Sequence, residues 1–254
     1  MKVFVCKNQF EDMMSCIYDA WSLALTCGHD NVYLMRGPIF QENMLDEYIY
    51  PECDSEKATK VIRSVSSKMG EGALMFIKYA SLSHEEDALD AIYRFMIRGF
   101  KIGHGITNAL TEPAVIRIME LRRNVGNEAH FFREFVRFTS VDNHIYISHI
   151  EPKNNVLELV GIHFADRMPS EHFIIIDDTR KLAMVHPRDE DSYLQVLEDD
   201  ELALLLKTDT VRDEYTNMWK AFFDAIAIDK RTNKKCQRNM LPLWMRKHMI
   251  EFMD

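Results

Sequence analysis

Residues 127–186 read NEAHFFREFVRFTSVDNHIYISHIEPKNNVLELVGIHFADRMPSEHFIIIDDTRKLAMVH, and this stretch decides the expected fold. It contains two short runs rich in β-branched and aromatic residues, at 135–139 and 145–150. Runs of this composition are typical of β-strands. They are separated by Val141-Asp142-Asn143-His144, in which the Asp and the Asn tolerate the left-handed backbone of a tight turn. The first part of the stretch therefore predicts a β-hairpin.

A helix is predicted after this hairpin. Asn154 or Asn155 can cap its first turn, and the residues of one helical face recur from Val156 to Arg167. The sequence Met168-Pro169-Ser170 ends the pattern, because the residue before a proline disfavours helical backbone. Two further strand-like runs follow, at 173–176 and 182–186. The expected order is β-hairpin, helix, β-hairpin.

The sequence on either side of this stretch is mainly helical in pattern. Strand-like runs occur at 2–6 and 31–35. Apolar spacing and capping residues predict helices at about 10–28, 55–69, 73–82, 83–99, 111–132 and 214–228. We therefore expect an α+β protein, in which a small, mainly antiparallel sheet from the central hairpins is packed with N-terminal and C-terminal helices.

The length of the chain limits the number of domains that we expect. A chain of 254 residues can form one large domain or two small ones. We expect one α+β domain over residues 1–254. The alternative division places an N-terminal helical lobe in residues 1–132, and the sheet with the C-terminal helices in residues 133–254.

The amino-acid composition limits the classes of protein to which this chain could belong. Hydrophobic residues make up 47% and charged residues 28% of the chain, which is usual for a soluble globular protein. The formal net charge of −9 argues against a globally basic nucleic-acid binder but not against a local basic patch. No apolar run approaches the roughly 20 residues of a membrane span. Because the N-terminus lacks the apolar core of a signal peptide, we expect a cytoplasmic protein with no membrane partner.

Residue spacings give no metal or cofactor signature. The five cysteines include no CxxC pair, which argues against structural zinc and a disulfide framework. The absence of CxxxCxxC excludes an iron–sulfur cluster of the radical-SAM type in this chain. HExxH and GxSxG are also absent, and the spread of His130, His144, His149, His163 and Asp177 shows no zinc-type spacing. We predict no metal and no cofactor.

Two charged segments lie in the C-terminal part of the chain. No Asp or Glu occurs from residue 230 to residue 250. Phosphate contacts, with Trp244 stacking on a base, are predicted there for Lys230, Arg231, Lys234, Lys235, Arg238, Arg246 and Lys247. The alternative is a terminal helix whose basic side chains cap carbonyls and balance the acidic segment 189–201. We expect that acidic segment to be a solvated excursion or an edge helix, and docking of a partner is the alternative.

Ionisable residues also gather near the ends of the predicted central elements. His163 and Arg167 are four residues apart and share a helix face. With Asp166 nearby, His163 is the candidate general base, although it also fits a boundary histidine of the core. The whole group is Arg137, His149, Glu151, His163, Asp166, Arg167, Asp177 and Arg180.

Arg137 is the strongest binding candidate in this group. It lies inside an apolar run, and a buried guanidinium requires a partner. That partner is either a phosphate or carboxylate of a ligand, or the internal carboxylate of Glu128 or Asp166. In the first case Arg137 and Arg167 line a nucleic-acid-binding face. The simplest interpretation of the Asp166–Arg167 and Asp177–Arg180 pairs is cap and turn salt bridges.

Several motifs occur in one order along nearly the whole chain. They are Tyr18-Asp-Ala-Trp21, Phe135-Val-Arg-Phe138, Ile150-Glu-Pro152, His163-Phe-Ala-Asp-Arg167, Asp177-Asp-x-Arg180, Tyr215-x-x-Met-Trp-Lys220, Arg231-Thr-Asn-Lys-Lys-Cys-Gln237 and Met240-Leu-Pro-Leu-Trp-Met-Arg246. In this arrangement the chain resembles a bacterial family of undetermined activity described as "probable DNA metabolism protein". The resemblance implies a module found beside a radical-SAM protein and sometimes fused to a uracil-DNA glycosylase-like domain. It implies no catalytic residues.

Three functional hypotheses follow. The first is a non-catalytic, nucleic-acid-associated accessory protein that works with a radical-SAM partner in DNA repair or modification. The second is an enzyme acting on nucleic acid or nucleotides, with His163 as general base and a neighbouring carboxylate. The third is a protein–protein adaptor that docks through the acidic segment 189–201.

Overall fold

The computed structural model describes residues 1–39, 41–141, 144–205 and 214–252. The chain divides into two compact units, Met1–Gly126 and Asn127–Asp254. Helix α5, Pro113–Phe135, contributes residues to both units, because the boundary follows Gly126.

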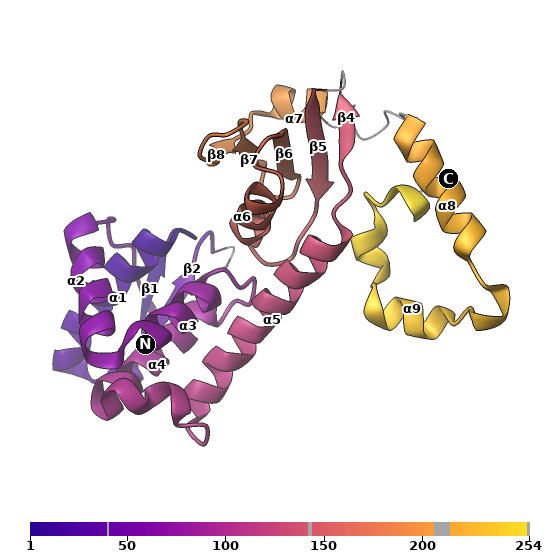
Figure 1. The fold of residues 1–254 in the computed structure, drawn as a ribbon. Coiled ribbons are helices and arrows are strands. Elements are labelled where there is room, and N and C mark those ends of the chain that lie inside the picture. The colour runs from indigo at the N-terminus through magenta and orange to yellow at the C-terminus, as the bar shows by residue number, and fades with distance from the viewer. Residues whose placement is uncertain (40, 142–143, 206–213, 253–254) are drawn as a thin grey trace. The chain divides into compact units, whose positions relative to one another are not determined.

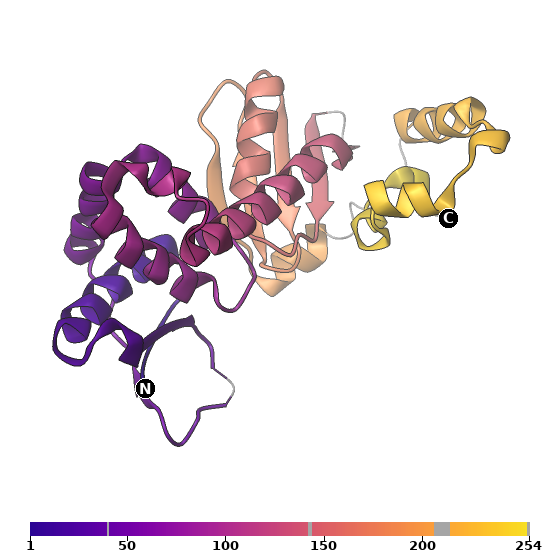
Figure 2. The same ribbon diagram turned by 90° about the horizontal axis from the view of Figure 1, so that it is seen from below.

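The N-terminal unit contains a parallel sheet of its own. Strands β1 (Lys2–Cys6), β2 (Val32–Arg36) and β3 (Glu47–Ile49) pair in the order β2-β1-β3. Both neighbours of β1 run parallel to it. The helices around this sheet (Figures 1 and 2) are α1 (Phe10–Cys27), η1 (His29–Asn31), α2 (Ser55–Met69), α3 (Glu71–Ser81), α4 (Ala88–Ile102) and η2 (Gly103–Asn108).

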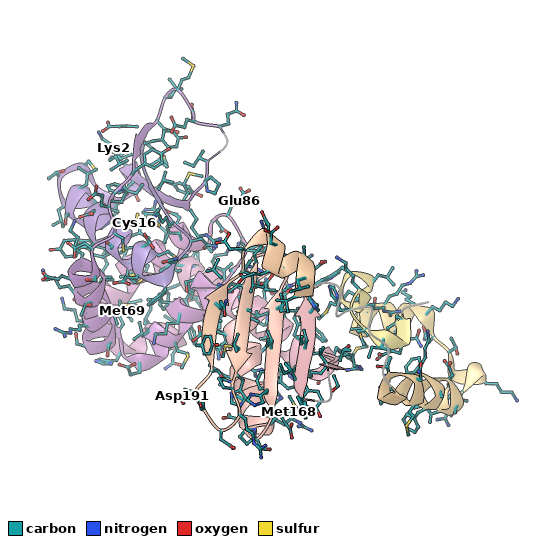
Figure 3. The ribbon with its side chains drawn as sticks, turned by 90° about the horizontal axis from the view of Figure 1, so that it is seen from above. Lys2, Cys16, Met69, Glu86, Met168 and Asp191 are labelled. Atoms are coloured by element: carbon teal, nitrogen blue, oxygen red, sulfur yellow. The ribbon has the colours of Figure 1, made fainter. Side chains whose placement is uncertain are left out.

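Helix α2 shows how the sequence specifies these helices. The side chain of Asp54 accepts hydrogen bonds from the backbone N–H groups of Glu56 and Lys57, which satisfies two donors of the first turn. Buried residues recur on one face from Ala58 to Met69. Gly70, with φ of +90°, then ends the helix. Cys16 and Met69 are among the fully buried side chains of this core (Figure 3).

The C-terminal unit is built on a five-stranded sheet in the order β4-β5-β6-β7-β8. Strands β5 and β6 are parallel, and helix α6 (Leu157–Arg167) connects them; the other neighbouring strands are antiparallel. Helix α6 packs on β6 and β7 (Figure 2). The strands are β4 (Thr139–Val141), β5 (Ile145–Ile150), β6 (His172–Asp177), β7 (Leu182–His186) and β8 (Tyr193–Val196). The predicted α+β class and mainly antiparallel central sheet are therefore confirmed.

The first strand of the central stretch begins later than expected. Helix α5 continues to Phe135, and the N–H of Val136 still donates to the carbonyl of Phe132. The strand predicted at 135–139 is wrong for this reason, and β4 occupies Thr139–Val141 instead. Arg137 consequently lies in the connection between α5 and β4. The predicted turn residues Asp142 and Asn143 lie outside the described residues.

The remaining helices lie after β8. They are α7 (Asp199–Leu205), α8 (Glu214–Ile226), η4 (Asp229–Arg231), α9 (Lys234–Met240), η5 (Leu243–Arg246) and η6 (Ile250–Phe252). Apolar spacing in the predicted helix 214–228 favours an inward face made of Tyr215, Met218, Trp219, Phe222, Phe223 and Ile226. This expectation is wrong for Met218, Trp219, Phe222 and Ile226, which are exposed. Met218 and Phe222 are 60% and 54% exposed. Periodicity identified the helix correctly, but it cannot show whether a partner surface covers the apolar face.

The acidic segment forms part of the second unit's fold. Residues Tyr193–Val196 pair with β7 as an edge strand, and Asp199 begins helix α7. Leu197 and Leu202 are buried in a small core with Ile147, Ile176 and Ala183. Within the described ranges, no helix is long and apolar enough to cross a membrane.

Candidate functional site

The polar residues of the C-terminal unit meet at the carboxyl ends of the parallel strands β5 and β6. Ile150 is in register with Asp177, so Glu151 and Asp178 follow directly at the same edge of the sheet. In α/β arrangements, the carboxyl ends of parallel strands are where loops place binding and catalytic groups. This edge is therefore the first place to expect a site.

Asp177 and Arg180 fix the loop after β6. The Asp177 carboxylate accepts hydrogen bonds from the N–H groups of Thr179 and Arg180, at 3.1 and 3.0 Å. It also pairs with the Arg180 guanidinium at 2.8 Å. Burial raises the pKa of Asp177, and the Arg180 charge opposes that rise. Arg180 donates to the carbonyls of Pro152 and Lys153 as well, so the loops after β5 and β6 are tied together.

Glu128 binds the backbone of the loop after β5. Its buried carboxylate accepts hydrogen bonds from the backbone N–H groups of Lys153 and Asn154, each at 2.8 Å. The Asn154 side-chain amide donates a third at 2.5 Å. Glu128 thus satisfies donors in the turn between β5 and α6. Neither Asp177 nor Glu128 is free to bind a ligand in this arrangement.

Four other ionisable side chains gather beside these loops. The His149 ring nitrogen Nδ1 lies 2.8 Å from Oδ1 of Asp178, and the two side chains are only 2% and 8% exposed. The ring of His248 stacks on His149 with a centroid separation of 5.9 Å. His248 Nε2 lies 3.7 Å from Oε1 of Glu151 and 3.6 Å from Oδ2 of Asp178. The site therefore combines two imidazoles and two carboxylates.

Arg137 has an internal partner. Its guanidinium forms a two-point contact with Glu251, with Nη2 at 2.7 Å from Oε1 and Nε at 3.3 Å from Oε2. It also lies over the ring of Trp219, 5.3 Å from the centroid. The partner is thus neither Glu128 nor Asp166, which the sequence suggested. Arg137 holds the C-terminal segment, and its role in nucleic-acid binding stays a prediction.

Three other predicted nucleic-acid contacts are also held internally. Lys247 pairs with Glu151. The Arg246 guanidinium donates to the carbonyl of Leu241 and packs on the ring of Phe252. Trp244 is partly exposed, and Lys153 lies 5.2 Å from the centroid of its ring. These contacts hold the C-terminal segment within its unit, so the three side chains do not form an open basic surface.

The rest of the basic segment is exposed. Five exposed side chains, which we call the basic surface, belong to Lys230, Arg231, Lys234, Lys235 and Arg238. Within the described residues, none of these five forms an ion pair with a carboxylate. Asn233 caps helix α9 by accepting a hydrogen bond from the N–H of Cys236, so three of the basic residues follow a defined helix start.

The helix α6 candidates lie apart from the histidine–carboxylate cluster. His163 is partly buried and packs edge-to-face on Phe164, with ring centroids 5.3 Å apart. Asp166 and Arg167 are both exposed. None of the three lines the small cavity that borders His149, Glu151 and His248. Their catalytic and binding roles stay predictions.

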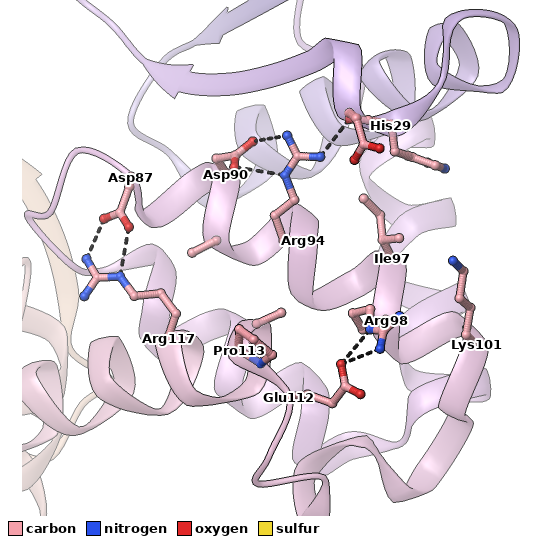
Figure 4. A pocket seen from close by; sticks show the side chains of 13 residues that line it. His29, Asp87, Asp90, Arg94, Ile97, Arg98, Lys101, Glu112, Pro113 and Arg117 are labelled. Atoms are coloured by element: carbon pink, nitrogen blue, oxygen red, sulfur yellow. Dashed lines mark hydrogen bonds and ion pairs between the residues drawn. The ribbon is translucent and has the colours of Figure 1, made fainter.

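The N-terminal unit has a larger pocket, of about 710 Å³. Its arginines are already paired with carboxylates (Figure 4). The pairs are Arg117 with Asp87 at 2.6 Å, Arg94 with Asp90 at 3.1 Å and Arg98 with Glu112 at 2.6 Å. An anionic ligand would have to displace a carboxylate from each guanidinium, so this pocket is a weaker candidate.

Sequence reasoning missed two members of the histidine–carboxylate cluster, and it also missed Glu251, the partner of Arg137. Asp178 is recognisable from sequence only as a turn residue, and no local pattern points to His248 or Glu251. His149 and Glu151 belong to the candidate group, but their partners are 29 and 96 residues away along the chain. No spacing motif connects residues at such separations. The one available signal for this site was the pair Asp177-Asp178, which directly follows the predicted strand at 173–176.

The comparisons place the chain in a family. The sequence model of a domain of unknown function, DUF4130, matches residues 86–251. This span covers more than half of the chain, and it includes the histidine–carboxylate cluster and the basic surface. A comparison with curated proteins finds no match. The chain therefore belongs to the uncharacterised DUF4130 family.

Proposed function

We propose that this protein is a nucleic-acid-binding accessory protein in DNA metabolism that acts with a radical-SAM partner. The observation that carries the binding proposal is the basic surface, in which five exposed cationic side chains lie without carboxylate partners among the described residues. The role in DNA metabolism and the partner rest on the resemblance of the sequence motifs to the "probable DNA metabolism protein" family.

The distribution of charge favours the binding of a polyanion to the basic surface. The protein has a formal net charge of −9, so the absence of Asp and Glu from residue 230 to residue 250 runs against its overall composition. Cationic side chains that neutralise phosphates release bound counterions, which makes the association favourable at low salt. The ring of Trp244 is 39% exposed and lies in the same segment, and we propose that it stacks on a base in place of Lys153.

Several of the predicted phosphate contacts have other partners within the C-terminal unit. Arg137, Arg246 and Lys247 are already used in contacts inside the unit. Lys230, Arg231, Lys234, Lys235 and Arg238 would supply most of the phosphate contacts. Replacing Arg137 would change binding indirectly, by loosening the segment that carries the basic surface.

The proposal is tested by fluorescence-anisotropy titration with short single-stranded and double-stranded DNA. The test variant carries Lys234→Glu, Lys235→Glu and Arg238→Glu. The control carries Lys60→Glu, Arg63→Glu and Arg123→Glu, which are exposed positions of the N-terminal unit with the same change in net charge. We expect the test variant to bind at least about 10-fold more weakly than the control. Equal affinities of the two variants would refute the basic surface as the binding site.

A further inference from the structure

We propose that Glu151, Asp178 and His248 form a binding site for one divalent transition-metal ion. The three residues come from the loop after β5, the loop after β6 and the segment between η5 and η6. One ligand atom from each lies within 4.8 Å of the other two. This inference is independent of the proposed nucleic-acid function, because no residue of the basic surface contributes a ligand atom.

The distances are close to those of a coordination sphere. In a tetrahedral zinc site with ligands at about 2.1 Å, neighbouring ligand atoms are about 3.4 Å apart. His248 Nε2 lies 3.7 Å from Oε1 of Glu151 and 3.6 Å from Oδ2 of Asp178. The third separation, between the Glu151 and Asp178 oxygens, is within 4.8 Å, and the Glu151 side chain is 31% exposed, which leaves it room to change rotamer.

Asp178 supplies a separate reason to place an ion here. Its Oδ2 atom is buried and accepts no hydrogen bond from any described residue. A buried carboxylate oxygen without a donor is costly, and such atoms are rare in folded proteins. Its other oxygen, Oδ1, is held by His149 Nδ1 at 2.8 Å. His149 is therefore a positioning residue that aims the second oxygen of Asp178 into the site.

The ligand set selects the class of ion. One imidazole with two carboxylates suits Zn²⁺, Mn²⁺ or Fe²⁺, whereas Mg²⁺ and Ca²⁺ prefer oxygen ligands alone. The cavity beside Glu151 and His248, which Asp178 does not line, has a volume of about 20 Å³, enough for one water molecule next to these two ligands. Three protein ligands and one water would complete a four-coordinate ion.

Lys247 is the internal competitor for this site. Its ammonium group pairs with Glu151, but its side chain is 61% exposed and can move into solvent. A bound divalent ion would replace that single positive charge next to two carboxylates. Removing the ammonium group by Lys247→Ala should therefore leave metal affinity equal to or higher than that of the wild-type protein.

The test is calorimetric titration of the full chain, treated with a chelator, with Zn²⁺, Mn²⁺ or Mg²⁺. We expect one Zn²⁺ or Mn²⁺ per chain and much weaker binding of Mg²⁺. Asp178→Asn and His248→Gln should each weaken binding at least about 10-fold. The control His130→Gln alters an exposed His–Glu pair and should not change affinity. Absence of saturable binding, or wild-type affinity in both site variants, would overturn the proposal.

Hydrogen exchange gives a second readout that does not depend on the variants. An ion bound to His248 and to the two loops would link the C-terminal segment to the sheet. Addition of Zn²⁺ should therefore slow amide exchange of residues 245–250 in the wild-type protein. Identical exchange of this segment with and without a saturating concentration of the ion would contradict a site that includes His248.

Discussion

At the scale of single residues, Asp87 couples protonation to folding. Hydrogen bonds from Arg117 hold the pKa of this carboxyl below its usual value, and burial opposes the shift only in part. A carboxyl group whose pKa is lowered in the folded state stabilises the fold above its unfolded pKa of about 3.9. That contribution is lost as the pH falls through the lower, folded-state value.

Asp87→Asn should therefore lower the free energy of unfolding at neutral pH. The expected loss is only about 0.5–1 kcal/mol, because the side chains of Asp87 and Arg117 are both partly exposed and solvent screens their attraction. The difference from wild type should shrink at about pH 3, where Asp87 is largely protonated in the unfolded state. Urea denaturation at both pH values measures it. A difference that is the same at neutral and acidic pH would show that the Asp87 charge is not its cause.

Glu128 is expected to have a larger effect, because it is buried. Glu128→Ala leaves the N–H groups of Lys153 and Asn154 without their acceptor. Each buried donor without a partner costs about 1–3 kcal/mol. The matched control is Glu134→Ala, an exposed position on the same helix that should change stability by less than about 0.5 kcal/mol. Thermal unfolding of the two variants compares them, and equal midpoints would contradict the role given to Glu128.

Part of the candidate site was predictable at this scale. The sequence indicated the Asp177–Arg180 turn pair, because both residues lie in one tight turn and interact locally. It also showed that Arg137 needs a partner. It did not identify Glu251 as that partner, because the contact joins positions 114 residues apart. A local pattern carries no information on contacts formed only after the chain folds back on itself.

At the scale of elements, helix α6 is packed so closely on the sheet that a single methyl group matters. A Cβ atom added at Gly161 would lie 2.4 Å from Cγ of Met184 in β7. The added volume should cost about 1–3 kcal/mol, which exceeds the roughly 1 kcal/mol that alanine gains over glycine inside a helix.

Gly126 in helix α5 provides the opposite case, since no atom lies within 4 Å of the position that an added methyl group would occupy. We expect Gly161→Ala to lower the free energy of unfolding and Gly126→Ala to raise it by up to about 1 kcal/mol. Chemical denaturation of the two variants decides the point. A stabilised Gly161→Ala protein would show that α6 is not closely packed against β7.

Elements with strong local signals were predicted well. The strand at Lys2–Cys6 and the helix at Ser55–Met69 agree with the structure, because their apolar spacing and caps are local. The strand at 135–139 was not, because an aromatic run fits the last turn of a helix as well as a strand. The pairing of β1, β2 and β3 into a parallel sheet depends on contacts between distant segments, and sequence patterns do not determine it.

At the scale of the whole molecule, the uneven distribution of charge is the main functional signal. The acidic segment 189–201 contains the edge strand β8, so its deletion would remove part of the sheet. Replacing its exposed carboxylates is a cleaner test of the adaptor hypothesis than deletion. The basic surface can be altered at Lys234, Lys235 and Arg238 without loss of buried contacts, because these residues are exposed.

The salt dependence of DNA affinity tests directly whether the basic surface contacts phosphates. The anisotropy titration is repeated from about 50 mM to about 200 mM salt for the wild-type protein and the Lys234→Glu, Lys235→Glu, Arg238→Glu variant. If the basic surface contacts phosphates, the wild-type affinity falls steeply with salt. The slope of log affinity against log salt should then be shallower by roughly 3 in the variant, about 1 for each lost contact. Equal slopes for the two proteins would contradict binding through this surface.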